Sequence, residues 1–73
     1  MRASKPDAED HSKIYLFKNV SRLHATYQIR LLTVRAVDVG KKLIVRVPKL
    51  CEIEADLMSL IQEFKKTIKI EKV

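Results

Sequence analysis

The chain has one glycine, one cysteine, two prolines and no tryptophan in 73 residues. Loops that cradle phosphates in P-loop nucleotide hydrolases need several glycines, so the single Gly40 excludes that class of enzyme. A lone cysteine, Cys51, cannot form an internal disulfide and is typical of a reducing compartment, so we expect a cytoplasmic protein. One cysteine and two histidines at unrelated positions, His11 and His24, do not make a zinc site.

Long apolar runs are also missing from the sequence. No stretch approaches the roughly 20 apolar residues of a membrane-spanning helix, and residues 1–13 lack the apolar core of a signal peptide. We therefore expect a protein that neither inserts into a membrane nor is exported. Residues 1–12 show no apolar periodicity, which predicts a flexible tail before a single domain over residues 13–73.

Positive charge is the main excess in the composition. Fifteen Lys and Arg residues against nine Asp and Glu residues give a net charge of +6, which favours polyanions, such as nucleic acids, or acidic protein partners. Because the cations fall on several predicted elements, we expect a diffuse field and weak, salt-sensitive nucleic-acid binding. A chain of this length holds only a small core, so we also expect self-association or a bound partner.

Three short segments, 13–18, 42–47 and 67–73, have the composition and alternation of strands. In the first strand, one face holds Ile14 and Leu16 and the other holds Tyr15 and Phe17. In the second strand, the core face holds Leu43, Val45 and Val47, and the opposite face holds Ile44 and Arg46. Pro48 ends the second strand, and the third strand is predicted near an edge of the sheet.

A first helix is predicted over residues 22–39, capped by the side-chain oxygens of Asn19 and Ser21 and ended by Gly40. Its apolar residues fall on two opposite stripes, Leu23, Tyr27, Leu31 and Val34 on one, and Ala25, Ile29, Leu32, Ala36 and Val39 on the other. One stripe should meet the sheet, and the other should meet the second helix or another molecule. A hairpin about Gly40 and Lys41 is the alternative for this region.

A second helix is predicted from the spacing i, i+4, i+7, i+8 and i+11 of Ile53, Leu57, Leu60, Ile61 and Phe64. Acidic residues near its start and basic residues near its end agree with the helix dipole: Glu52, Glu54, Asp56, Lys65 and Lys66. We expect the last four apolar residues to be buried against Leu43 and Val45. The element order β-α-β-α-β predicts an α/β (α+β) two-layer sandwich, a small sheet with two helices on one face.

No set of residues in the sequence forms a recognisable catalytic or metal-binding motif. His24 lacks partners for either role and is interpreted as a surface histidine. Cys51 stands before a helix, where backbone amides lower a thiol pKa, but its acidic neighbours Glu52 and Glu54 oppose this effect. We therefore expect a half-buried structural cysteine, and we predict no catalytic residue, no cofactor and no metal.

The candidate interaction surface is the sheet face opposite the helices, which carries Tyr15, Phe17, Ile44 and Arg46. Lys13 or Lys69 lies nearby, depending on the strand register. Such a face can stack single-stranded bases or form a protein interface. We rank an interface with a second copy or a protein partner first, formed either by this face or by the second stripe of the first helix.

The segment RLHATYQIRLLTVRAVDVGKKLIVRVP, followed by Asp56 and Leu57, resembles the TusA/SirA-type small sulfur-carrier family. Matching features are a long helix, a glycine, a strand with the pattern GxxLxV followed by proline, and a later aspartate. The resemblance implies a two-layer α/β sandwich with the helices on one face of a mixed sheet. The family's sulfur-carrying C-P-x-P motif is replaced here by Leu23-His24-Ala25-Thr26, so the resemblance implies the fold and not sulfur transfer.

These features predict a non-enzymatic, basic interaction module that self-associates and has a diverged sulfur-carrier-like fold. An RNA-binding or single-stranded nucleic-acid-binding protein is the first alternative, because of the charge and the Tyr15, Phe17 and Arg46 face. A sulfur-relay protein is the second alternative, and it depends only on the family resemblance.

Overall fold

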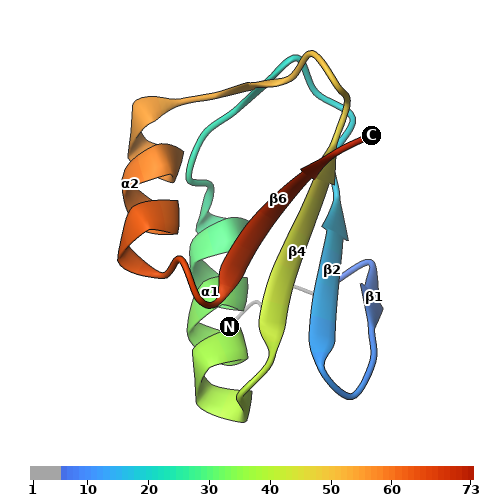
Figure 1. The fold of residues 1–73 in the computed structure, drawn as a ribbon, viewed down its shortest axis with the longest axis vertical. Helices are drawn as coiled ribbons and strands as arrows, with labels where there is room; N and C mark the ends of the chain where they lie inside the picture. The colour runs from blue at the N-terminus through green and yellow to red at the C-terminus, as the bar shows by residue number, and fades with distance from the viewer. Residues whose placement is uncertain (1–5) are drawn as a thin grey trace.

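A computed structural model describes residues 6–73 as a four-stranded sheet covered on one face by two helices (Figure 1). The sheet order is β1-β2-β4-β6, with β1 at Ala8–Glu9, β2 at Lys13–Phe17, β4 at Lys42–Val47 and β6 at Ile68–Lys72. Helix α1 (Tyr27–Val39) connects β2 to β4, and helix α2 (Ala55–Glu63) connects β4 to β6. The predicted α/β two-layer class and the main β-α-β-α-β order are confirmed.

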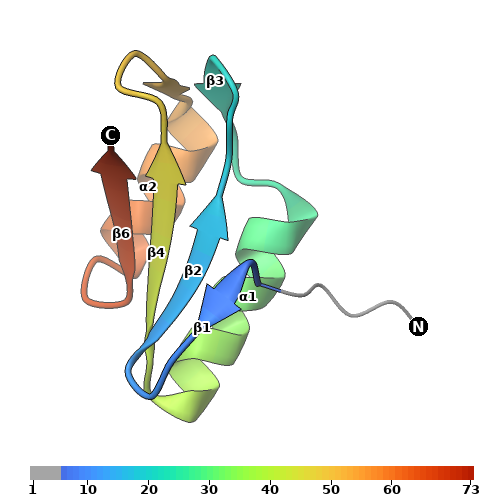
Figure 2. The ribbon, with the colours of Figure 1, turned by 90° about the vertical axis from the view of Figure 1, so that its right-hand side faces the viewer.

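Both helices lie on the same face because of how the strands are connected. Strands β2, β4 and β6 are parallel neighbours, so the two connections step in the same direction across the sheet. Parallel crossovers are almost always right-handed, and two right-handed steps in one direction put both helices on one side. Figure 2 shows both helices behind the sheet. We call the opposite side, which neither helix covers, the open face.

Helix α1 begins five residues later than the sequence predicts. Arg22–Leu23 forms a two-residue strand, β3, which pairs in parallel with β5 at Glu52–Ile53. The N-cap is Thr26, whose Oγ1 accepts a hydrogen bond from the Ile29 amide at 3.1 Å. The predicted capping by Asn19 and Ser21 is therefore wrong, because Arg22–Leu23 pairs with β5 and the helix begins only after Thr26.

Gly40 ends helix α1 as predicted. It has a φ of 72°, in the left-handed region that favours glycine. The Gly40 amide donates to the Val37 carbonyl at 3.3 Å and the Lys41 amide donates to the Ala36 carbonyl at 2.9 Å. The chain turns directly from this cap into β4, so the helix is confirmed and the hairpin alternative is excluded.

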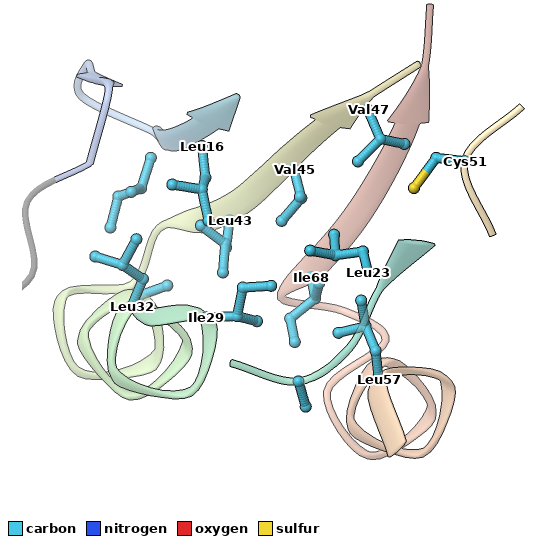
Figure 3. Close-up of a cluster of buried hydrophobic side chains, with 13 residues drawn as sticks. Leu16, Leu23, Ile29, Leu32, Leu43, Val45, Val47, Cys51, Leu57 and Ile68 are labelled. Atoms are coloured by element: carbon cyan, nitrogen blue, oxygen red, sulfur yellow. The ribbon is translucent and has the colours of Figure 1, made fainter. Parts of the chain in front are cut away.

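The core fills the space between the sheet and the helices (Figure 3). The strands contribute Ile14, Leu16, Leu43, Val45, Val47 and Ile68, and the helices contribute Ile29, Leu32, Ala36 and Leu57. The predicted alternation of β2 and β4 is confirmed. Leu57 is fully buried, whereas Leu60, Ile61 and Phe64 are only partly buried and pack against the core from its rim. Ile53, which the spacing placed on the second helix, belongs to β5.

The short strand β1 lies inside the segment predicted to be a flexible tail. It pairs antiparallel with β2, and the Asp7 carboxylate accepts a hydrogen bond from the Phe17 amide at 2.7 Å. The Glu9 carboxylate contacts Arg35 at 3.0 Å and Lys41 at 2.6 Å. Residues 7–9 are thus attached to the sheet and to the end of helix α1, and the tail prediction is wrong for them. Residues 1–5 of the predicted tail lie outside the described residues.

Replacing Leu57 with alanine should lower the free energy of unfolding by about 2–5 kcal/mol, because the side chain is fully buried between α2 and the sheet. Its exposed neighbour Met58 provides the matched control, and Met58→Ala should change stability by less than about 0.5 kcal/mol. Urea denaturation followed by circular dichroism measures both values. Equal midpoints for the Leu57 variant and the wild type would contradict the assigned core face of α2.

Candidate interaction surfaces

The strand register gathers the four predicted interaction residues on the open face. Tyr15 pairs with Ile44, and Phe17 pairs with Arg46. The rings of Tyr15 and Phe17 have centroids 6.2 Å apart, and the Arg46 guanidinium carbon lies 5.4 Å from the first and 5.8 Å from the second. These distances are within the range of cation–π interactions. Ile44 is only 3% exposed. It therefore packs beneath the exposed side chains of the open face, and a partner cannot contact it directly.

Lysines from three strands share the same face. Lys13 pairs with Lys42, and Ile44 pairs with Lys69. Successive strand residues alternate between faces, so all three lysines lie opposite the core, together with Arg46. Lys42 and Arg46, two of the cations behind the prediction of a diffuse field, thus share one face, whereas Arg35 and Lys41 contact Glu9 on the helix side. The open question about Lys13 and Lys69 is also answered, because the register puts both on the open face.

Two open depressions border this face at opposite ends of the strands. The first has a volume of about 400 Å³ and is lined by Lys42, Lys65, Lys66, Thr67, Ile68 and Lys69. The second has a volume of about 450 Å³, lies at the carboxyl ends of the parallel strands, and is lined by Phe17, Lys18, Asn19, Arg46, Val47, Pro48 and Val73. The carboxyl ends of parallel strands are where α/β proteins commonly bind ligands.

Glu71 holds the Arg46 side chain in place. The Arg46 Nε donates to Glu71 Oε1 at 2.8 Å, and the two residues are register partners. This hydrogen bond, together with the positive charges of Lys69 and Lys13, lowers the pKa of Glu71 below its ordinary value of 4.5. Glu71 therefore stays ionised at neutral pH and keeps the guanidinium beside the two rings.

Helix α1 presents the second candidate surface. Tyr27 and Val34 are 68% and 64% exposed, and Leu31, which lies between them on the same side of the helix, is partly buried. We call these three residues the outer stripe of α1. Of the predicted stripe, Leu23 does not belong to it, because it is buried in β3. Val39 is half exposed, although the spacing grouped it with the core-facing residues.

Cys51 is more deeply buried than predicted. It is 1% exposed, belongs to the core cluster, and lies in the loop before β5 instead of directly before a helix (Figure 3). Its sulfur contacts the Glu52 carbonyl oxygen at 3.7 Å. A thiol in this position is a packing group and is shielded from reagents in solution.

The acidic residues near Cys51 take separate structural positions. Glu52 lies in β5, Glu54 is the N-cap of α2 but its side chain makes no capping hydrogen bond, and Asp56 lies in the first turn. One Asp56 carboxylate oxygen accepts a hydrogen bond from the Ala25 amide at 3.2 Å. Asp56 thus links the start of α2 to the segment before α1. His24, the other residue considered for chemistry, is exposed.

Within residues 6–73, no group of three or more His, Cys, Asp or Glu side chains is placed to hold a metal ion. In the same range, no helix has the length and apolar character needed to cross a membrane. Comparison of the chain with protein-family models, curated proteins and solved structures finds no match. The resemblance to the sulfur-carrier family stays a prediction.

Replacing Arg46 with glutamine should raise the pKa of Glu71 toward 4.5, since it removes the hydrogen bond that contributes most to the shift. The titration of the Glu71 carboxyl carbon can be followed by NMR. Arg35→Gln is the control, because Arg35 contacts Glu9 on the helix side of the sheet. An unchanged Glu71 pKa in the Arg46 variant would contradict the geometry of the open face.

The Cys51 thiol should react with an aromatic disulfide reagent only after the protein unfolds, because it is almost completely buried. The reaction can be followed by absorbance in buffer and in concentrated urea. Incubation with a sulfur donor followed by mass spectrometry should likewise give no persulfide on the folded protein. Rapid labelling of the thiol under native conditions would show that the loop containing Cys51 opens readily.

Proposed function

We propose that this protein is a non-enzymatic interaction module that self-associates through the outer stripe of α1. The observation that carries the proposal is the exposure of Tyr27 and Val34 on a helix whose opposite side is fully buried. Continuous apolar patches on the surface of a small domain mark association sites. A second copy of the chain covers this patch and adds apolar burial to a core limited by the length of the chain.

The outer stripe suits a symmetric dimer better than the open face does. A two-fold interface brings the same patch of both copies together. On the open face, this arrangement would bring the lysines of both copies, Lys13, Lys42 and Lys69, into one interface, and like charges in an interface oppose association. On α1, Tyr27 and Asp38 lie at the two ends of one helix side. Antiparallel pairing of two copies puts the tyrosine hydroxyl of one near the aspartate of the other.

A non-enzymatic role is supported by how the described residues use their polar groups. Among residues 6–73, the buried polar side chain is that of Thr33, and its hydroxyl donates a hydrogen bond to the Ile29 carbonyl at 2.7 Å. No buried side-chain nitrogen or oxygen among residues 6–73 lacks a hydrogen-bond partner. Active sites commonly contain buried groups in unusual environments. The single cysteine, which favours a reducing compartment, supports a cytoplasmic location.

Sulfur relay receives less support than self-association. The residues at the position of the family's C-P-x-P motif include no cysteine, and Cys51 is buried in the core. A sulfur carrier must present its thiol to a donor and then to an acceptor. Such a role would need Cys51 to leave its packed position at each transfer.

Val34→Glu should shift the protein to the monomer, because it places a charge at an exposed position of the outer stripe. The wild type should show a mass that rises with concentration in sedimentation velocity. Its association should persist at high salt, since apolar burial is not screened. Met58→Glu is the matched control, because it puts the same charge at an exposed apolar position on α2 and should leave association intact.

Two results would contradict this proposal. One is a wild type that stays monomeric up to millimolar concentration. The other is a Val34 variant that associates as strongly as the wild type. Circular dichroism checks that the variants keep the fold, as expected for substitutions at exposed helix positions.

A further inference from the structure

We infer that the open face is a second, separate site that binds single-stranded nucleic acid with little preference for sequence. Helix α1 packs against the other face of the sheet (Figure 2). Its outer stripe lies on the side of the helix opposite its buried residues. A nucleic-acid strand on the open face therefore does not compete with self-association through α1. The inference stands independently of the proposed dimer.

The charge of the open face identifies the ligand as a polyanion. Lys13, Lys42, Arg46 and Lys69 project from its three parallel strands, and Glu71 is the one carboxylate among the open-face positions of those strands. Lys65 and Lys66 extend the positive region around the depression at the start of β4 and β6. Phosphates bound by lysines release counterions, which supplies most of the affinity in binding that does not depend on sequence.

The aromatic residues select nucleic acid over an acidic protein. Phe17 is 48% exposed, and Tyr15 beside it is partly buried. The Arg46 guanidinium lies within 6 Å of both ring centroids, held there by Glu71. Rings and guanidinium groups are the surfaces on which proteins stack unpaired bases. A group of two rings and one arginine beside several lysines matches a ligand with flat bases and a charged backbone.

The arrangement along the strands favours a single strand over a duplex. Lys13 and Phe17 are four residues apart on β2, which separates them by about 13 Å. The lysine end can hold phosphates while the Phe17 end receives bases, next to the depression at the carboxyl ends of the strands. Bases in a duplex are stacked on each other and cannot reach the rings, so a duplex is limited to the charges.

Fluorescence anisotropy with a 12-nucleotide labelled oligo(dT) tests the inference, with a duplex of equal length as the comparison. We expect micromolar or weaker affinity at physiological salt, and tighter binding of the single strand than of the duplex. Phe17→Ala should weaken binding by about 5- to 150-fold, the range for losing one base–aromatic stack. Tyr27→Ala is the matched control, because it removes an aromatic ring from the outer stripe of α1 and should bind as the wild type does.

A second pair of variants tests the phosphate contacts. Replacing Lys42 and Lys69 with glutamine should reduce the slope of log affinity against log salt by about 1.4, or 0.7 for each lost contact. Arg30→Gln with Lys72→Gln removes the same charge from α1 and from the helix-covered face of β6, and its slope should fall by much less. The monomeric Val34→Glu protein should keep the affinity of the wild type.

Three outcomes would overturn the inference. The first is equal binding of single strand and duplex together with an unchanged affinity for Phe17→Ala, which would mean attraction by net charge alone. The second is displacement of the oligonucleotide by poly-glutamate at the same concentration as by unlabelled oligo(dT), which would favour an acidic protein partner. The third is no binding even at low salt.

Discussion

The handedness of the two crossovers is the constraint on which the rest of the structure depends. Strand β4 lies between β2 and β6 and is parallel to both. The helix that precedes β4 in the chain and the helix that follows it therefore pack on the same face of the sheet. The alternating residues of β4 are thereby divided: Leu43, Val45 and Val47 join the core, and Ile44 and Arg46 do not face the helices. A domain with helices on both faces would have buried the positions that here hold the cations.

Among the described residues, ion pairs neutralise cations on some parts of the surface and leave cations on other parts without a carboxylate partner, so the positive charge is unevenly distributed. On the helix side, the Glu9 carboxylate contacts both Arg35 and Lys41, and its pKa is lowered mainly by the hydrogen bond from Lys41. Arg22 pairs with Glu52 in the small β3–β5 sheet. On the open face, Glu71 alone faces several cations among the described strand residues. Among the described strand positions, the open face carries four cations, Lys13, Lys42, Arg46 and Lys69, and one carboxylate, Glu71, so positive charge predominates on the side of the sheet that the helices leave uncovered.

Much of the fold could be predicted because its signals are local. The alternation in β4 and β6, the core-facing Leu57 and the left-handed Gly40 each depend on a few neighbouring residues. The start of α1 was not predictable in this way, since Asn19, Ser21 and Thr26 are all capping residue types. Only the pairing of Arg22–Leu23 with a segment 30 residues away selects Thr26, and two-residue strands have no periodicity to detect.

The candidate surfaces were predicted only in part, because some of their features depend on local patterns and others on contacts between distant segments. The alternation of β2 and β4 placed Tyr15, Phe17 and Arg46 together, and the structure agrees. The gathering of Lys13, Lys42 and Lys69 requires the register of three strands, which is set by the core and not by any local pattern. The burial of Ile44 depends equally on its neighbours in the adjacent strands.

Strand β6 forms one edge of the sheet, with no further strand beside it among the described residues. An unpaired edge is a template on which other chains can add strands and build insoluble aggregates. Lys69 projects from one face of this edge and Lys72 from the other, and both are exposed. Two copies that meet edge to edge bring these lysines together, and their repulsion opposes the growth of a continuous intermolecular sheet. The same positive charge thus protects the native protein from fibril-like assembly.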